Sequence, residues 1–324
     1  MPGLISVSER DYIVNGVVAN IRADGRKRHE FRPIVLETGV ISQASGSSRI
    51  KLDTTDILVG IKFEVETFGS RSDDEDASHE DGVEASAAAT LEEDLQDDAS
   101  QDRGRVVCNV ECSPSASRSS DRKELDNMAT EYSEFMNRVL NAPHGGIDLK
   151  ALLIVPKTSC WVIYIDVLVL DMGGNLLDTI FLATRAALQN ARMPKVMLEQ
   201  VGGRYEYDVS DEETEIVKGW EDIPIAITYC KIGDRFVVDP TIMEEICTES
   251  KFIVGVNRHG RLCAVQKGGL GSISPNLMVS ILQSAPKVGL GLLGDLERCL
   301  NAESQRINNK LDPIGFLEEH GFMQ

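Results

Sequence analysis

The sequence has few basic residues for its length and no long apolar run. Lysine and arginine number 33 against 52 aspartate and glutamate residues, which gives a formal net charge of -19 over 324 residues. A chain with this balance is not expected to hold duplex nucleic acid through its overall field. The first residues lack the basic and apolar regions of a signal peptide, and no stretch of about 18 apolar residues follows. We therefore expect neither secretion nor contact with a membrane.

The cysteines lack any paired spacing. Seven are scattered along the chain, an odd number with no C-x-x-C motif, which argues against a disulfide framework and a zinc ribbon. Cys108 and Cys112 lie four residues apart in a strand-like run, so we expect them to share a face as buried thiols. The five histidines show no metal-ligand or nucleophile-elbow spacing. These patterns predict a reducing compartment, no metal site and no cofactor.

Residues 70–104 differ from the rest of the chain. They hold 13 acidic residues against two arginines, and the remainder of the chain carries a net charge of about -8. The segment has no aromatic and almost no branched aliphatic residue, so it cannot bury enough apolar surface to offset its ordering entropy. We predict a disordered acidic loop inserted between two neighbouring strands. A second interpretation is that this acidic segment attracts basic proteins.

Periodicity divides the chain into two similar halves. Short β-runs in residues 32–66 predict an antiparallel meander, and helical spacing predicts a helix from Lys123 to Leu140. Residues 160–171 are nearly all apolar, which predicts a strand buried on both faces. Asn175 is the predicted N-cap of a helix over 175–192 that is apolar almost all round and should lie between layers.

The second half repeats this order, with strands between 223 and 268 and a helix from about Pro275. Strands followed by helices in both halves predict an α+β fold built twice. The predicted organisation is an N-terminal extension (1–30), a first half (31–195), a linker (196–218), a second half (219–310) and a tail (311–324).

Two features could bind or act on phosphate. Gly173 and Gly174 stand between a strand and a helix, where backbone N–H groups can hold an anion. Because the sequence lacks both G-x-G-x-x-G and G-x-x-x-x-G-K-(S/T), the spacing favours a simple strand-to-helix turn. A carboxylate group near a strand end could hold Mg²⁺ or act as acid and base, or could instead mark the start of a helix. Its members are Asp234, Asp239, Glu244 and Glu245.

The third feature is a modest basic cluster. Arg118, Arg122, Lys123 and Arg138 lie in or just before the predicted helix at 123–140. Of these, Arg138, Arg122 and Lys123 are our candidates for RNA-phosphate contacts, with solvated surface charge as the alternative.

Long motifs connect the sequence to a known family. Residues 22–61 contain R-A-D-G-R, an R-P pair, a T-G turn and A-S-G-S, and later stretches read W-V-I-Y-I-D-V-L, G-G-N-L-L-D, A-A-L-Q-N-A-R-M-P and V-V-D-P-T-I-M-E-E. This pattern resembles the RNase PH family, and within it the core subunits of the eukaryotic RNA exosome. The resemblance covers roughly residues 10–300 and implies a duplicated ββαβα fold, of the ribosomal protein S5 domain 2-like type.

The resemblance also implies partners. It leads us to expect a six-membered ring of paralogous RNase PH-like subunits, S1/KH-type cap subunits, an associated hydrolytic exonuclease and single-stranded RNA. The implied role is 3'-to-5' RNA processing and degradation, including rRNA maturation and mRNA decay. Nucleus, nucleolus and cytoplasm are the expected locations.

The same resemblance implies that this member has no catalytic residues. Phosphorolytic relatives carry Gly-Gly-Thr-Arg where this chain has Asn175 and Leu176 after the glycines. They also use two aspartates six residues apart; Asp239 matches the second, and Gly233 stands at the first. RNA-binding relatives carry two helix arginines four apart, of which Arg138 matches the second, while Glu134 stands at the first. We therefore expect a non-catalytic subunit; the alternative is an active phosphorolytic exoribonuclease using Asp234 and Asp239.

Overall fold

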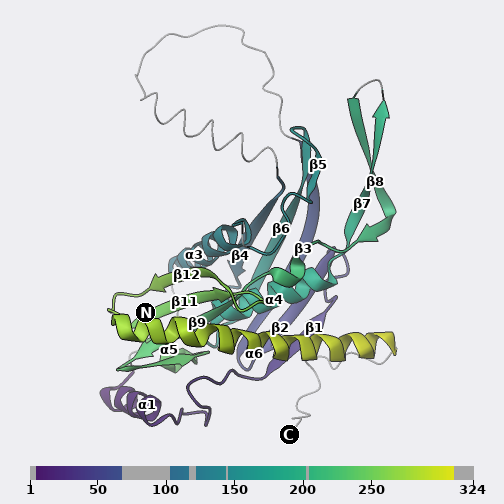
Figure 1. The fold of residues 1–324 in the computed structure, drawn as a ribbon. Coiled ribbons are helices and arrows are strands. Elements are labelled where there is room, and N and C mark those ends of the chain that lie inside the picture. The colour runs from purple at the N-terminus through teal and green to yellow at the C-terminus, as the bar shows by residue number, and fades with distance from the viewer. Residues whose placement is uncertain (1–4, 68–102, 117–121, 144, 202–203, 310–324) are drawn as a thin grey trace, which may run out of the picture.

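The computed structural model describes residues 5–67, 103–116, 122–143, 145–201 and 204–309. Nearly all of the predicted acidic loop, Arg118 and the predicted tail lie outside these residues. Figure 1 shows two sheets with helices between and around them, which confirms the α+β prediction.

The first half is built on a six-stranded sheet. Its strands are β1 (Ile34–Thr38), β2 (Gly46–Leu52), β3 (Thr55–Thr67), β4 (Arg105–Cys112), β5 (Leu153–Val155) and β6 (Ser159–Asp171). The order is β1-β2-β3-β6-β4, with β5 paired to β6. The predicted meander is confirmed, because β1, β2 and β3 pair antiparallel in sequence.

Two predictions about this sheet are wrong. Strand β6 lies between β3 and β4, so the strands that flank the acidic segment are not neighbours; β4 runs parallel to β6. Strand β6 is also not buried on both faces, because burial alternates beyond Val162 and Asp166 is exposed. Both helices of this half cover the same side of the sheet, so the other side faces outward (Figure 1).

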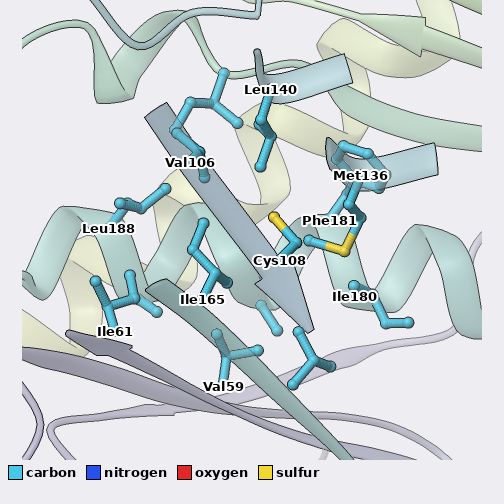
Figure 2. Close-up of a cluster of buried hydrophobic side chains, with 14 of the residues drawn as sticks. Val59, Ile61, Val106, Cys108, Met136, Leu140, Ile165, Ile180, Phe181 and Leu188 are labelled. Atoms are coloured by element: carbon cyan, nitrogen blue, oxygen red, sulfur yellow. The ribbon is translucent and has the colours of Figure 1, made fainter. Parts of the chain in front are cut away.

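Helices α3 (Arg122–Leu140) and α4 (Leu176–Asn190) form that cover. Figure 2 shows Met136 and Leu140 from α3 meeting Phe181 from α4 above the strand residues. Every residue of α4 from Leu176 to Leu188 is buried, because α4 packs on β2 and β3 on one side and on β9 of the second half on the other. The predicted interior helix is confirmed. The buried thiol of Cys108 belongs to this core, whereas Cys112 on the same strand is half-buried.

The second half is a four-stranded sheet covered by a long helix. Its strands are β9 (Ile225–Ile232), β10 (Arg235–Val238), β11 (Ser250–Val256) and β12 (Leu262–Gly268), in the order β10-β9-β11-β12. A short helix α5 (Ile242–Ile246) follows β10, and α6 (Pro275–Asn308) lies against β9, β11 and β1 (Figure 1). By length and composition alone α6 could cross a membrane, but Ile281, Ala285 and Leu296 are buried against the body, as in a helix that covers a globular core.

The sequence patterns missed some elements. The predicted N-terminal extension contains α1 (Val7–Ala19), which packs Ile13 and Val17 on the second half. The connection between the halves, predicted only as a linker, contains β7 (Met193–Val201), β8 (Arg204–Glu215) and a 3-10 turn, η1 (Trp220–Asp222). Strands β7 and β8 form a two-stranded sheet of their own.

A buried carboxylate joins the two halves at α4. Asp178 accepts hydrogen bonds from the backbone N–H of Thr228 at 2.9 Å and from its hydroxyl at 2.7 Å. Burial raises the pKa of Asp178 from 3.8 to about 7, although the bonds from Thr228 act in the opposite direction.

We predict that this carboxyl makes stability depend on pH. The folded chain keeps the Asp178 proton up to about pH 7, whereas the unfolded chain loses it near pH 4, so the free energy of unfolding should fall across that interval. The shift corresponds to about 4 kcal/mol. Urea unfolding of wild type and Asp178→Asn at several pH values between 4 and 8 measures the free energy of unfolding. We expect the variant to become more stable relative to wild type as the pH rises from 4 to 7. Parallel curves would contradict the prediction.

Candidate functional site

The Gly173–Gly174 turn between β6 and α4 is closely packed. A Cβ on Gly173 would lie 1.9 Å from Thr54 Oγ1, and one on Gly174 would lie 2.6 Å from the Pro240 carbonyl oxygen. Gly174 also has a φ of 96°, which favours glycine. The glycines are therefore required because the turn is clamped between the β2–β3 hairpin and the β10–α5 loop.

Arginines from the chain's N-terminal region converge on this turn. Arg32 donates to the carbonyl oxygens of Gly173 at 3.3 Å and Gly174 at 3.0 Å. Its guanidinium and backbone N–H also donate to both carboxylate oxygens of Asp239, at 2.8–3.0 Å. Arg26 adds a 2.7 Å ion pair to the same carboxylate. Asp239 is fully buried, so two guanidinium groups compensate one buried charge.

These cations keep Asp239 ionised. Burial alone would raise the pKa of Asp239, but the hydrogen bonds and charge of Arg32, with the charge of Arg26, lower it below 3.8. Burial acts to lower the pKa of Arg32, and Asp239 reverses that effect, so the pKa of Arg32 is raised. Asp239 adopts a φ of 47°, a left-handed conformation that the surrounding bonds hold in place.

A second buried ion pair lies beside the first. Arg22 donates to both oxygens of Glu244, at 2.8 and 2.5 Å, and to the carbonyl oxygens of Val238 and Asp239. Glu244 also accepts from the Thr241 N–H in the capping box of α5. Arg22, Arg26 and Arg32 thus tie the segment before β1 to the loop after β10.

Asn175 occupies the first position after the glycines. Its side-chain amide donates to Asp239 at 2.8 Å, and its backbone N–H donates to Glu245 at 3.2 Å. The predicted N-cap is thus correct in position but different in mechanism, because Asn175 has a left-handed φ of 54° and makes no side-chain cap bond. Its side chain is directed to the ion pairs instead of the helix.

One backbone N–H at the N-terminus of α4 is already bonded to an anion of the chain itself. Glu245 accepts from the Asn175 N–H, and Lys251 donates to Glu245 at 3.1 Å. Burial alone would lower the pKa of Lys251, but Glu245 raises it, so this ammonium stays charged. The backbone donor that could bind phosphate here therefore has an internal partner.

The predicted carboxylate group does not form one site. Asp239, Glu244 and Glu245 come together, whereas Asp234 is exposed in the turn before β10. The four residues of β10 separate Asp234 from Asp239 by about 16 Å. Two such carboxylates cannot act on one phosphodiester. Among the described residues, no group of three or more histidine, cysteine, aspartate or glutamate side chains is arranged to hold a metal ion.

The predicted basic cluster is also dispersed. Arg122 and Lys123 begin α3, and Arg138 is in its last turn, about 24 Å away along the axis. Arg138 is exposed, lies over the Phe135 ring at 5.3 Å and donates to Gln266 on β12. These cations form two separate surface positions.

Sequence comparison defines the class of protein. The profile of the 3' exoribonuclease family, domain 1 (RNase PH), matches residues 30–194, and that of domain 2 matches residues 222–288. The chain belongs to the RNase PH family.

The particular relatives share one name. A Dictyostelium discoideum protein called putative exosome complex exonuclease RRP42 is 32% identical, covering 91% of this chain and 98% of the relative. The exosome complex component Rrp42 of Pyrococcus furiosus is 33% identical, covering 91% and 96%. A chain of the Archaeoglobus fulgidus exosome with RNA bound to the active site has the same fold, with a TM-score of 0.69 at 24% identity over 89% of this chain and 97% of that one.

Sequence reasoning missed most of the network. Arg22, Arg26 and Arg32 belong to a family motif that gives no indication of their acidic partners, which lie 207 to 222 residues later in the chain. The family pattern predicts a second carboxylate six residues before Asp239, where Gly233 stands, whereas Glu245 lies six residues after it. The sequence therefore does contain two carboxylates at this spacing, Asp239 and Glu245.

We predict that Asp239 stabilises the fold. Replacing it by Asn leaves Arg32 buried without a countercharge, which should lower the free energy of unfolding by about 3 kcal/mol. Asp234→Asn makes the same change at an exposed turn and should alter it by less than about 0.5 kcal/mol. Urea denaturation of both variants and wild type provides the measurement. Equal stability of the two variants would refute a structural role for the Asp239 ion pairs.

Proposed function

We propose that this chain is a non-catalytic ring subunit of an RNA exosome core, where it holds neighbouring subunits and lines the RNA path. The proposal is supported by archaeal relatives named as exosome complex components, which align over nearly their whole length with this chain. The expected assembly contains paralogous RNase PH-like subunits in a six-membered ring, S1/KH-type cap subunits and a separate hydrolytic exonuclease. Its substrates would be single-stranded RNAs in rRNA maturation and mRNA decay, in nucleus, nucleolus and cytoplasm.

One observation carries the non-catalytic part of the proposal. The acidic side chains around Gly174 already have partners within the chain: Asp239 with Arg32 and Arg26, Glu244 with Arg22, and Glu245 with Lys251 and the Asn175 N–H. An attacking phosphate would have to displace Glu245 from the helix N-terminus. No arginine or threonine follows the glycines to offset that loss.

The alternative is an active phosphorolytic exoribonuclease. The word exonuclease in the name of the Dictyostelium relative favours it. The pair we assigned to that activity, Asp234 and Asp239, lies at opposite ends of β10, and Asp239 is enclosed by arginines. That pair therefore cannot meet one substrate, and the two carboxylates that do lie together, Asp239 and Glu245, are held by Arg32, Arg26 and Lys251.

Phosphate-dependent RNA shortening tests the choice. The chain alone and the ring reconstituted with its paralogues are incubated with RNA and inorganic phosphate, and released nucleoside diphosphates are measured. We expect no release from the chain alone, and equal release from rings that carry wild type or Glu245→Gln. Release by the isolated chain, or its loss from the ring with Glu245→Gln while assembly is intact, would support the active enzyme instead.

We also propose that Arg138 contacts RNA in the assembled ring. It is exposed near the end of α3, and its guanidinium is positioned by Phe135 and Gln266. A positioned guanidinium can contact a phosphate without reading sequence. The separated Arg122 and Lys123 would then meet a different part of the strand.

Arg138→Glu should weaken binding of single-stranded RNA by about threefold and reduce the slope of log K against log salt by about 0.7, the contribution of one phosphate contact. Filter binding or fluorescence anisotropy with the whole ring, over a range of salt, measures both. Arg298→Glu, an equally large charge change at a strongly exposed position on α6, serves as the control and should leave the slope unchanged. If Arg138→Glu behaves like the control, Arg138 is ordinary surface charge.

A further inference from the structure

The hairpin of β7 and β8, residues 193–215, forms an arm that projects from the body of the molecule. Figure 1 shows it extending away from both sheets, and its strands pair with each other alone. A two-stranded sheet exposes both of its edges and has little stability in water by itself. The arm therefore depends mainly on the contacts between its own two strands.

One face of the arm is an apolar stripe that continues outward from the core. Val196 pairs with Val209 at the base, where both are half-buried against the core of the first half. Two residues further out on the same face, Leu198 pairs with Tyr207, and these side chains are 52% and 36% exposed. The apolar stripe is thus covered by the core at its base and exposed to solvent further out, which indicates an interaction surface.

The charge of the arm limits what can cover it. Residues 193–215 contain seven acidic and two basic residues, and Lys195 is paired with Glu213. RNA phosphates would be repelled by this excess of acid. A second copy of this chain, with its own net charge of -19, would be repelled as well. A basic protein surface fits both the charge and the apolar stripe.

We propose that the Leu198–Tyr207 face of the arm docks on a basic surface of a different protein subunit of the same assembly. The partner would offer an apolar groove for Leu198 and Tyr207. Asp208 pairs with Met197 and Glu213 with Lys195 on the opposite face of the arm, so lysine or arginine side chains of the partner would reach these acids around its edge. This inference rests on the proposed function, since it needs an assembly with neighbouring subunits, and it names the surface that this chain contributes.

Association with the paralogous subunits tests the surface. A variant carrying Leu198→Ser, Tyr207→Ser, Asp208→Lys and Glu213→Lys should bind them at least tenfold more weakly in titrations, because it loses the apolar anchors and reverses the complementary charge. The changed side chains are exposed, so its melting temperature should match wild type. The control is Val265→Ser with Val279→Ser, at residues that are about half-exposed on β12 and α6, and it should bind like wild type.

A photo-crosslinking residue in place of Tyr207 tests the occupant without weakening the surface. In the reconstituted ring with bound RNA, we expect a crosslink to another protein subunit within a lysine- or arginine-rich segment. A crosslink to RNA or to a second copy of this chain, or no crosslink in an intact ring, would overturn the inference. Equal binding by the arm variant and wild type would also overturn it while leaving the proposed function in place. If the wild-type chain does not assemble at all, both fail.

Discussion

The buried carboxylate of Asp239 is the group on which the join between the two halves depends. Arg32 and Arg26 neutralise it, Asn175 donates to it, and Arg32 at the same time holds the carbonyls of Gly173 and Gly174. Three segments that are far apart in sequence therefore meet at one charge. They are the segment before β1, the start of α4 and the loop after β10. A buried charge is tolerated only when it is fully paired, so each segment constrains the other two.

This arrangement gives a physical reason for the motifs at the start of the chain. R-A-D-G-R and the following R-P pair supply Arg22, Arg26 and Arg32, and V-V-D-P-T with the acidic residues after it supplies Asp239 and Glu244. The two motifs are the positive and negative sides of one contact. Their presence together therefore accounts for the way in which the two halves pack here.

Elements with a strong local pattern could be predicted from the sequence, and long-range placement could not. The runs that became β2 and β3 alternate clearly, and α3, α4 and α6 show helical spacing, so these were found nearly at their observed bounds. The position of β6 between β3 and β4 depends on pairing across the sheet, which no local signal encodes. The sequence predicts only a linker for the charged arm, because the arm is defined by backbone hydrogen bonds between β7 and β8 and not by an alternating pattern of apolar residues.

The site shows the same division. The glycine pair and Asp239 were recognised individually, but their roles depend on Arg32, which lies 141 residues before Gly173 and 207 before Asp239. Spacing rules look for partners close in sequence, and here the decisive partner of each group is remote.

The ion pairs and the arm are consistent with one division of labour. Catalysis by phosphorolysis needs an open positive position for the attacking anion, and this chain fills that position with Glu245 and Lys251. The three acidic side chains at this position are thereby all paired within the chain. A centre held by these ion pairs can support a weakly stabilised arm that extends to a neighbour, since the arm's ordering has to be compensated by binding and not by the body itself. The ion pairs that occupy the start of α4 are thus in keeping with the proposed role of holding other subunits in place.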